Sequence, residues 1–418
     1  MSKPNNQKIR VLRIISRLNV GGPSIHVKNL TEGLSNTKYE TKLIAGSLSA
    51  NEGDMSYIIQ SYMADIIAIP ELQRELNPLK DLMALLKIMS TINRFKPDVV
   101  HSHLSKAGTI SRFAVFICNM FLKKKIIMVH TFHGHVLDSY FTPIKTYIFL
   151  IIERLLAKVS DGIVAISSTQ KWELSKKYKV ADSSKIFLIN LGFDLNPFVQ
   201  ANKLKGTLRH QIGVSDDTLL IGLIGRLVPI KNHKMFLDAA KNYLKNAKDK
   251  KVKFIIVGDG ELRRPLELYS LEMGLKDHVV FYGWEKNIPM IYADLNVLAL
   301  TSLNEGTPVS IIEAMAASVP VVTTGVGGIK DLLGRIESDQ PDGSGFKICE
   351  RGVLCPKDDS IAFSNALKYI TDSDYLSDNC RLTTARDFVI KNYSIERLIY
   401  DIDLLYEKLM IGRTPYRN

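Results

Sequence analysis

The chain has 418 residues, enough for two domains of ordinary size, and its 46% apolar and 23% charged residues are typical of a soluble globular protein. Its four cysteines show no CxxC or Cys/His metal spacing, so the pattern favours reduced thiols in a cytosolic protein over a disulfide framework. The net charge of +12 indicates an acidic partner, for which nucleic acid, anionic lipid and phosphorylated small molecules are all candidates.

The N-terminal residues "MSKPNNQKIRVLRIIS" are polar and contain no apolar segment of a signal peptide. The most apolar stretches, "RFAVFICNMFL" and "YIFLII", are well short of the ~20 residues that a membrane-spanning helix needs. We therefore expect a cytoplasmic protein.

The first half of the chain alternates short β-branched runs with longer helical patterns. We predict strands at residues 8–15, 42–46, 65–69, 98–103, 126–132, 162–167 and 185–190. Helical spacing is clearest at residues 24–34 and 78–95. This βαβ rhythm predicts a parallel sheet with helices on both faces.

The rhythm restarts after a polar segment between Asn196 and Asp217. A second series of strands is expected at residues 218–227, 251–260, 278–284, 293–302, 319–328 and 351–355. The predicted fold is α/β, with two doubly wound Rossmann-like domains at residues 1–200 and 206–390. Ligands bind such sheets at the carboxyl ends of the strands, so we expect the site in a cleft between the domains. Residues 393–410 have helical spacing and could pack on either domain.

The segment "NEGTPVSIIEAMA" follows a predicted strand and places two glutamates eight residues apart. Thr307 is a good N-cap and Pro308 suits the first helical position, so Glu305 lies in the loop and Glu313 about two turns into the helix. A helix N-terminus suits a phosphate, and the carboxylates on either side could bind sugar and ribose hydroxyls. The alternative is two solvated glutamates beside a cap.

The segment "IGLIGRLVPIKN" places Arg226 and Lys231 just after another predicted strand. Two cations there could neutralise a diphosphate leaving group, Arg226 as a bidentate donor and Lys231 as a point charge. The alternative is surface charge at the edge of a domain.

Two glycine pairs follow predicted strands. In "NVGGPS", Gly21 and Gly22 permit close approach of the backbone, and Pro23 begins a helix. In "VGDGEL", Gly258 and Gly260 do not complete a GxGxxG fingerprint, so we predict no dinucleotide site.

Histidines gather at two further strand ends. "VHTFHGH" carries His130, His133 and His135, and "HSHLSKAG" carries His101, His103 and Lys106. Metal binding is possible, but no carboxylate or cysteine stands at a recognised ligand spacing, so hydrogen bonding to a substrate is favoured.

Positive charge is concentrated between Lys80 and Lys125, which contains nine Lys/Arg residues and only two acids. Apolar helical runs lie in the same stretch. This combination suits contact with an anionic membrane surface. The alternative is a solvated helix face with an ordinary core.

Together these loops resemble glycosyltransferase family 4, the retaining transferases with a GT-B fold, over nearly the whole chain. The family's glutamate–seven–glutamate motif matches Glu305 and Glu313, and its Arg-x4-Lys pair matches Arg226 and Lys231. The diglycine loop matches Gly21 and Gly22, and the histidine in a T-x-H-G setting matches His133.

The resemblance implies how a nucleotide-sugar donor is held, chiefly by the second domain. Arg226 and Lys231 would stabilise the diphosphate, Glu313 would hold the ribose and Glu305 the sugar hydroxyls. His133 would hydrogen-bond the transferred sugar, which keeps its anomeric configuration, and no metal is required. Further donor contacts would come from Gly22, Gly225, Gly306, Thr307, Pro308 and Val309, and acceptor contacts from Gly21, His103 and Lys106. Residues 395–418 would form a helix that crosses back to the first domain.

The implied donor is a UDP-sugar carrying a hexose-type group, with a guanine nucleotide as the alternative, and the acceptor is a saccharide. The basic, apolar stretch Lys80–Lys125 favours a lipid-linked acceptor at the inner face of the cell membrane, as in polysaccharide, lipopolysaccharide or capsule biosynthesis, with a soluble acceptor as the alternative. No nucleic acid partner is expected, since the phenylalanines near Lys123 lie in apolar runs. A sugar-nucleotide epimerase on the same fold and a non-catalytic sugar-nucleotide binder stay open as alternatives.

Overall fold

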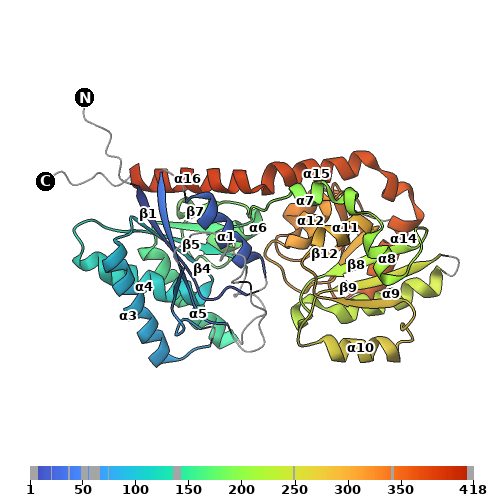
Figure 1. Cartoon of the computed structure of the whole chain (residues 1–418), viewed down its shortest axis with the longest axis horizontal. Helices are drawn as coiled ribbons and strands as arrows, with labels where there is room; N and C mark the ends of the chain where they lie inside the picture. Colours follow the sequence, from blue (N-terminus) through green and yellow to red (C-terminus); the bar gives the residue numbers. More distant parts are fainter. Residues whose placement is uncertain are drawn as a thin grey trace. The chain divides into compact units, whose positions relative to one another are not determined.

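The computed structural model describes residues 8–19, 21–35, 38–48, 55, 66–73, 75–134, 143–247, 250–339 and 343–411. The chain divides into two compact units, Met1–Phe193 with Ile395–Asn418, and Asp194–Ser394 (Figure 1). Each unit contains its own sheet and its own buried apolar core, so each is described by itself.

The first unit is built on a seven-stranded sheet in the order β3-β2-β1-β4-β5-β6-β7, and every pairing in it is parallel. Its central strands are buried on both faces, which explains their nearly continuous Val, Ile and Leu. The strands are β1 Ile9–Ile15, β2 Tyr39–Ala45, β3 Ile66–Ala68, β4 Val99–His103, β5 Ile127–Phe132, β6 Gly162–Ala165 and β7 Ile186–Leu188.

Helices cover both faces of this sheet. The helices α1 (Gly22–Gly33) and α16 (Ile395–Ile411) share one core cluster with β1, β4 and β5. The helices α3 (Pro78–Phe95) and α4 (Ser105–Phe121) share another cluster with the opposite face of the same strands. The helix α5 (Pro143–Val159) contacts α4, and the remaining helical segments are α6 Ser168–Trp172, the π-helical turn Glu173–Lys177 and the 3-10 turn Ser183–Lys185.

The helix α16 is fixed to the first unit by polar contacts as well as by its apolar side. The Tyr406 hydroxyl is hydrogen-bonded to His101 Nδ1 at 2.7 Å, and Arg397 donates to the Asn190 carbonyl at 2.9 Å. Lys38 forms ion pairs with Asp403 and Glu407 on the outer side of the helix. Residues 412–418 lie outside the described part of the chain.

The second unit has an eight-stranded sheet in the order β10-β9-β8-β11-β12-β15-β14-β13. Its parallel strands are β8 Leu219–Ile224, β9 Val252–Val257, β10 Val279–Gly283, β11 Val297–Leu300, β12 Val321–Thr324 and β15 Gly352–Cys355. The strands β13 (Ile336–Asp339) and β14 (Lys347–Cys349) are antiparallel additions that the sequence pattern did not predict. They are only three or four residues long, and β14 turns back on β15 through Glu350 and Arg351.

The second unit's core lies between this sheet and its longer helices. The α-helices are α7 Asn196–Val199, α8 Thr207–Ile212, α9 His233–Asn246, α10 Arg263–Glu272, α11 Ile288–Asp294, α12 Val309–Ala316, α13 Ile329–Leu333, α14 Ser360–Asp372 and α15 Asn379–Tyr393. Short 3-10 turns occur at Ala201–Leu204, Pro229–Lys231 and Asp374–Ser377.

The boundary between the units differs from the predicted bounds of 1–200 and 206–390. The second unit begins at Asp194 and ends at Ser394. Its polar opening segment packs on α11. Asp294 accepts hydrogen bonds from the backbone N–H groups of Gly206 and Arg209, and the Phe198 ring packs edge-on against Tyr292. A segment that reads as a linker by composition is therefore part of the second unit.

Within the described residues, no helix has the length and apolar character needed to cross a membrane.

Candidate active site

The loop after β8 carries the first pair of predicted site residues. The Arg226 side chain is exposed and, within the described part of the chain, makes no hydrogen bond or ion pair. Lys231 ends the 3-10 turn Pro229–Lys231, and its aliphatic stem passes 3.6 Å from where a Cβ on Gly225 would lie. The loop thus presents one free guanidinium and one lysine whose stem lies over Gly225.

Lys231 is paired with Glu305 from the loop after β11. The Nζ–Oε1 distance is 2.5 Å, and the Ser302 hydroxyl donates to the same Oε1 at 2.6 Å. Both side chains are largely withdrawn from solvent, with 19% and 12% exposed. Two residues from separate loops, predicted to bind different parts of a donor, therefore form one contact at the carboxyl edge of this sheet.

The helix α12 begins one residue later than predicted. Pro308, not Thr307, is the N-cap, because its ψ of 121° is extended, and Val309 is the first helical residue. Glu313 is consequently the fifth residue of the helix, just over one turn in rather than two. No side chain caps the N-terminus of α12, so its first N–H groups have no side-chain acceptor at the cap position.

Glu313 lies beside Tyr292 of α11, whose hydroxyl can donate to Glu313 Oε2 at 2.9 Å or to the Ser310 carbonyl at 3.0 Å. Burial raises the pKa of Glu313 to about 7, and the hydrogen bond from Tyr292 only partly offsets this. The carboxyl group is therefore about half protonated at neutral pH, which makes its charge sensitive to a bound ligand.

A glycine-rich loop that no prediction singled out supports Glu305. Gly327, after β12, has φ +53°, and a Cβ there would lie 1.8 Å from the Glu305 carbonyl oxygen. The next residue, Gly328, donates its N–H to the Gly306 carbonyl at 3.0 Å. The only signal in the sequence was the run "GVGG" directly after a strand.

The pair Gly258 and Gly260 has a similar packing role. A Cβ on Gly258 would lie 2.1 Å from the Gly225 carbonyl oxygen, and one on Gly260 would lie 2.6 Å from that of Leu227. These glycines let the loop after β9 close against the loop after β8. Their packing explains the glycines without a dinucleotide.

At the carboxyl edge of the first unit's sheet, histidines form a layer in which His26, His101 and His103 are buried and His133 is partly buried. His103 Nδ1 and His133 Nε2 are 3.0 Å apart, and the ring of His26 lies 5.5 Å and 4.9 Å from those two rings. His101, on the same strand as His103, is hydrogen-bonded through Nε2 to Thr131 at 2.7 Å. His26 lies in the first turns of α1, and no sequence motif pointed to it.

These imidazoles are neutral at physiological pH. Burial lowers the pKa of His133 to about 3 and those of His26 and His103 well below the usual range. Neutral rings can both donate and accept hydrogen bonds, as recognition of sugar hydroxyls requires.

The side-chain nitrogens of His26, His103 and His133 lie within 4.8 Å of one another, a spacing that could hold a metal ion. Arg13 of β1 is fully buried beside them, and its charge contributes to the lowered pKa of His26 and of His103. That cation would repel a divalent ion, so the trio suits a hydroxyl-bearing ligand better than a metal.

The metal alternative considered from the sequence rested on a different trio. His130 points to the other face of the sheet, where Nδ1 lies 2.9 Å from the Ser102 hydroxyl and the ring packs on Gly108. His135 lies outside the described residues. His130 and His133 therefore do not form one cluster.

The remaining first-unit candidates have mixed positions. Gly21 has φ +155° and caps α1, which begins at Gly22 rather than at Pro23. Lys106 forms an ion pair with Asp81 of α3 at 2.6 Å and donates to the Glu75 carbonyl. Lys106 therefore ties α4 to α3, which weakens its case as an acceptor contact.

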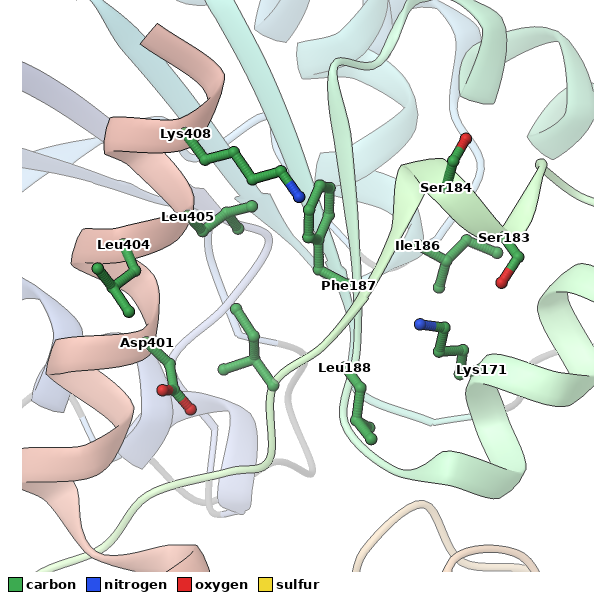
Figure 2. A pocket seen from close by; sticks show the side chains of 11 residues that line it. Lys171, Ser183, Ser184, Ile186, Phe187, Leu188, Asp401, Leu404, Leu405 and Lys408 are labelled. Atoms are coloured by element: carbon green, nitrogen blue, oxygen red, sulfur yellow. The ribbon is translucent and has the colours of Figure 1, made fainter. Parts of the chain in front are cut away.

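A separate pocket of about 560 Å³ lies beside the edge strand β7 (Figure 2). Residues of β7, α6 and α16 line it, and Lys408 points toward the Phe187 ring, 5.1 Å from its centroid. None of its lining residues is a predicted site residue.

Comparison with known proteins decides the family. The model of Glycosyltransferase Family 4 matches residues 20–197, and that of Glycosyl transferases group 1 matches residues 218–373. The chain belongs to glycosyltransferase family 4. It is 30% identical to the Escherichia coli UDP-Gal:alpha-D-GlcNAc-diphosphoundecaprenol alpha-1,3-galactosyltransferase, over 82% of this chain and 84% of that protein. It is 26% identical to the Staphylococcus aureus capsular polysaccharide biosynthesis glycosyltransferase CapM, over 66% and 71% of the two chains.

Solved structures of other proteins share the fold. The crystal structure of Anabaena HepE with UDP and glucose has a TM-score of 0.77 at 18% identity, covering 96% of this chain and all of that one. The lipopolysaccharide outer core galactosyltransferase WaaB has a TM-score of 0.67 at 15% identity, covering 96% and 100%. The protein is thus a glycosyltransferase with two Rossmann-like domains of the GT-B type. The roles of its individual site residues stay predictions.

Proposed function

We propose that this family 4 enzyme transfers a hexose-type sugar from a UDP-sugar to a lipid-linked saccharide, with retention of configuration and without a metal ion. The observation that carries the proposal is the contact between Lys231 and Glu305, with Arg226 free in the same loop as Lys231. At the carboxyl edge of one sheet, the cations suit the diphosphate end of a sugar nucleotide and the carboxylate suits the hydroxyls of its sugar.

Arg226 would be the first residue to bind the diphosphate of the nucleotide sugar, because its side chain has no partner among the described residues. As the bond between sugar and phosphate breaks, negative charge grows on the diphosphate, and Arg226 and Lys231 would stabilise it. The Lys231 ammonium group would then pair partly with the phosphate instead of with Glu305 alone. The Glu305 oxygen released in this way would accept a hydrogen bond from a sugar hydroxyl. The backbone N–H groups at the start of α12 would donate hydrogen bonds to the phosphate.

His133 would hydrogen-bond the transferred sugar, with its ring held by His103. The family resemblance favours attack on the same face as the departing phosphate. In that mechanism a phosphate oxygen takes the acceptor proton. Neither Glu305 nor Glu313 is then a general base.

The E. coli galactosyltransferase and CapM support polysaccharide biosynthesis as the setting, and the name of the former supports UDP as the carrier and a diphosphate-linked lipid as the acceptor. HepE, crystallised with UDP and glucose, is consistent with the same donor class. We place the enzyme in the cytoplasm, at the inner face of the cell membrane.

The test is transfer from UDP-galactose, UDP-glucose, UDP-N-acetylglucosamine or GDP-mannose to a short-chain prenyl diphosphate carrying N-acetylglucosamine, with Mg²⁺ or EDTA. We expect one UDP-sugar to give a disaccharide whose anomeric configuration, read by NMR, equals that of the donor, and EDTA to leave the rate unchanged. Inversion of configuration or loss of rate in EDTA would contradict the mechanism. Epimerised donor without transfer would favour the epimerase alternative.

A further inference from the structure

Three neighbouring helices of the first unit expose a broad apolar surface, which we name the α3–α5 face. On α5 it comprises Ile144, Tyr147, Ile148, Ile151 and Leu155, with Ile144 75% exposed. The helix α4 packs against both α3 and α5, so the three helices lie side by side. Soluble monomers rarely expose so many large apolar side chains together, and such a surface marks a docking site.

The same surface continues over α4 and α3. Phe113, Phe116, Met120 and Phe121 are exposed on α4, and Phe121 at its end is 82% exposed. On α3, Leu79, Leu82 and Leu86 are exposed. The spacing of three to four residues in Phe113, Phe116 and Met120, and in Leu79, Leu82 and Leu86, puts each of these sets on one side of its helix.

A buried ion pair fixes which side of α5 points outward. Arg112 of α4 donates through Nη2 to both carboxylate oxygens of Glu153 at 2.9 and 2.8 Å, and both side chains are fully buried. A helix that buries Glu153 must turn Ile148, Ile151 and Leu155 away from it. The outward apolar stripe is therefore set by the fold and does not result from a loosely packed helix.

Positive charges outnumber negative ones around the face, and two of them are already paired with nearby acids, Lys124 with Asp98 and Lys87 with Glu71. The helices α3, α4 and α5 with residues 122–125 contain eleven Lys/Arg and two acids. Both acids are neutralised, Glu153 by Arg112 and Asp81 by Lys106. The exposed run Lys123–Lys125 directly follows Phe121, and exposed Lys145 and Lys158 lie near the two ends of α5.

We propose that the α3–α5 face docks on an anionic lipid bilayer, with the apolar side of α5 lying in the interface and Lys123–Lys125 among the headgroups. This rests on the proposed function only in that a lipid-linked acceptor would give the docking its use. A second copy of the chain is a poorer occupant, because it would oppose two strongly positive surfaces. Apolar side chains ringed by lysines are the combination that binds an anionic membrane surface.

The proposal predicts two separable contributions to binding. The lysines contribute an attraction that weakens as salt screens it, whereas the apolar side chains of α5 contribute a term that salt does not remove. Vesicle flotation of the full chain measures both, with phosphatidylcholine vesicles that contain or lack 30% phosphatidylglycerol.

We expect Ile144→Ser, Ile148→Ser and Leu155→Ser together to reduce binding to the anionic vesicles at least tenfold at any salt. Lys123→Gln, Lys124→Gln and Lys125→Gln together should reduce it severalfold at low salt and little at high salt. Matched controls on the second unit should leave binding unchanged: Leu268→Ser with Leu271→Ser, both about half exposed, and Lys203→Gln with Lys245→Gln and Lys276→Gln. An unchanged melting temperature would confirm that each variant is folded.

Equal binding by wild type and both α3–α5 variants would overturn the proposal. So would a wild-type dimer in sedimentation velocity that the α5 variant dissolves while vesicles stay unbound. Transfer to a water-soluble acceptor separates the two proposals, since the α5 variant should keep that activity. Vesicle binding by an enzyme with no transfer to any acceptor would leave the docking standing and refute the proposed function.

Discussion

The carboxyl edges of the two sheets hold their polar groups in different ways. In the second unit three of the predicted groups lie on loops, with charged Lys231 and Glu305 in contact and Arg226 exposed, and Glu313 lies on α12. In the first unit His26, His101 and His103 are fully buried, and burial removes their charge. An edge that neutralises a diphosphate needs charge, whereas an edge that orients hydroxyls needs fixed neutral donors and acceptors.

The largest effect that this comparison predicts comes from the second unit's cations. Arg226→Ala and Lys231→Ala should each lower kcat by roughly 10²–10³-fold, because charge on the leaving group grows in the transition state. KM for the donor should rise much less. Steady-state kinetics with the identified UDP-sugar would measure both, and Arg264→Ala on α10, also exposed, is the control. Near-normal kcat in either variant would refute the charge role.

The second effect concerns the packing that holds Glu305. Gly327→Ala should destabilise the second unit by about 2–3 kcal/mol, since its Cβ would overlap the Glu305 carbonyl and its φ is positive. Gly343→Ala also has positive φ but meets no atom within 4 Å, so it measures the backbone strain alone. Urea unfolding of both variants gives the difference, and equal losses would show that the overlap relaxes at no cost.

Much of this fold could be predicted because its signals are local. Continuous apolar runs gave the parallel strands, and the Asn77 cap with Pro78 gave α3 its start at the predicted residue. The short antiparallel strands β13 and β14 were missed because three or four residues carry no periodicity. Whether Thr307 or Pro308 is the N-cap of α12 depends on one ψ angle, which composition does not determine.

Candidate site residues could be located from the sequence where they lie in loop motifs, and not where packing alone brings them together. Arg226, Lys231, Glu305 and Glu313 follow strands at fixed spacings. His26 joins His103 and His133 only because α1 folds onto the sheet, and α16 adds Tyr406 from more than 300 residues away. Nor does the apolar pattern of α5 distinguish an exposed stripe from a buried one without the Arg112–Glu153 pair.

A smaller effect should come from the first unit's histidines. His133→Ala should lower kcat about 10–100-fold, and His103→Ala should lower it less, by releasing the His133 ring. Because the pKa of His133 is about 3 and that of His103 is also lowered, saturating kcat should show no histidine titration between pH 5.5 and 8. An acidic limb near pH 6.5 that His133→Gln abolishes would contradict a neutral ring.

The smallest effect should be a pH dependence of donor binding through Glu313, whose pKa of about 7 reflects burial in the free protein. Ribose hydroxyls donate best to the ionised carboxylate, so binding should select that form. With a pKa near 7, roughly a tenth of the chains are ionised at pH 6 and nine tenths at pH 8, so affinity should rise about tenfold between them. Calorimetry with a UDP-sugar, which has no phosphate ionising in this range, would measure the rise.

Glu313→Gln is the matched variant, since it keeps the shape and removes the titration. It should bind the donor with one affinity at both pH values. The raised pKa of Glu313 affects folding stability with the opposite sign. Its stabilising contribution is present below about pH 4.5 and is lost as the pH rises to 7, so the free energy of unfolding should fall over that range. Glu313→Gln should not show this fall. If donor affinity and stability both ignored pH in the wild type, Glu313 would be ionised throughout, and the second unit would hold charge at its helix as well as at its loops.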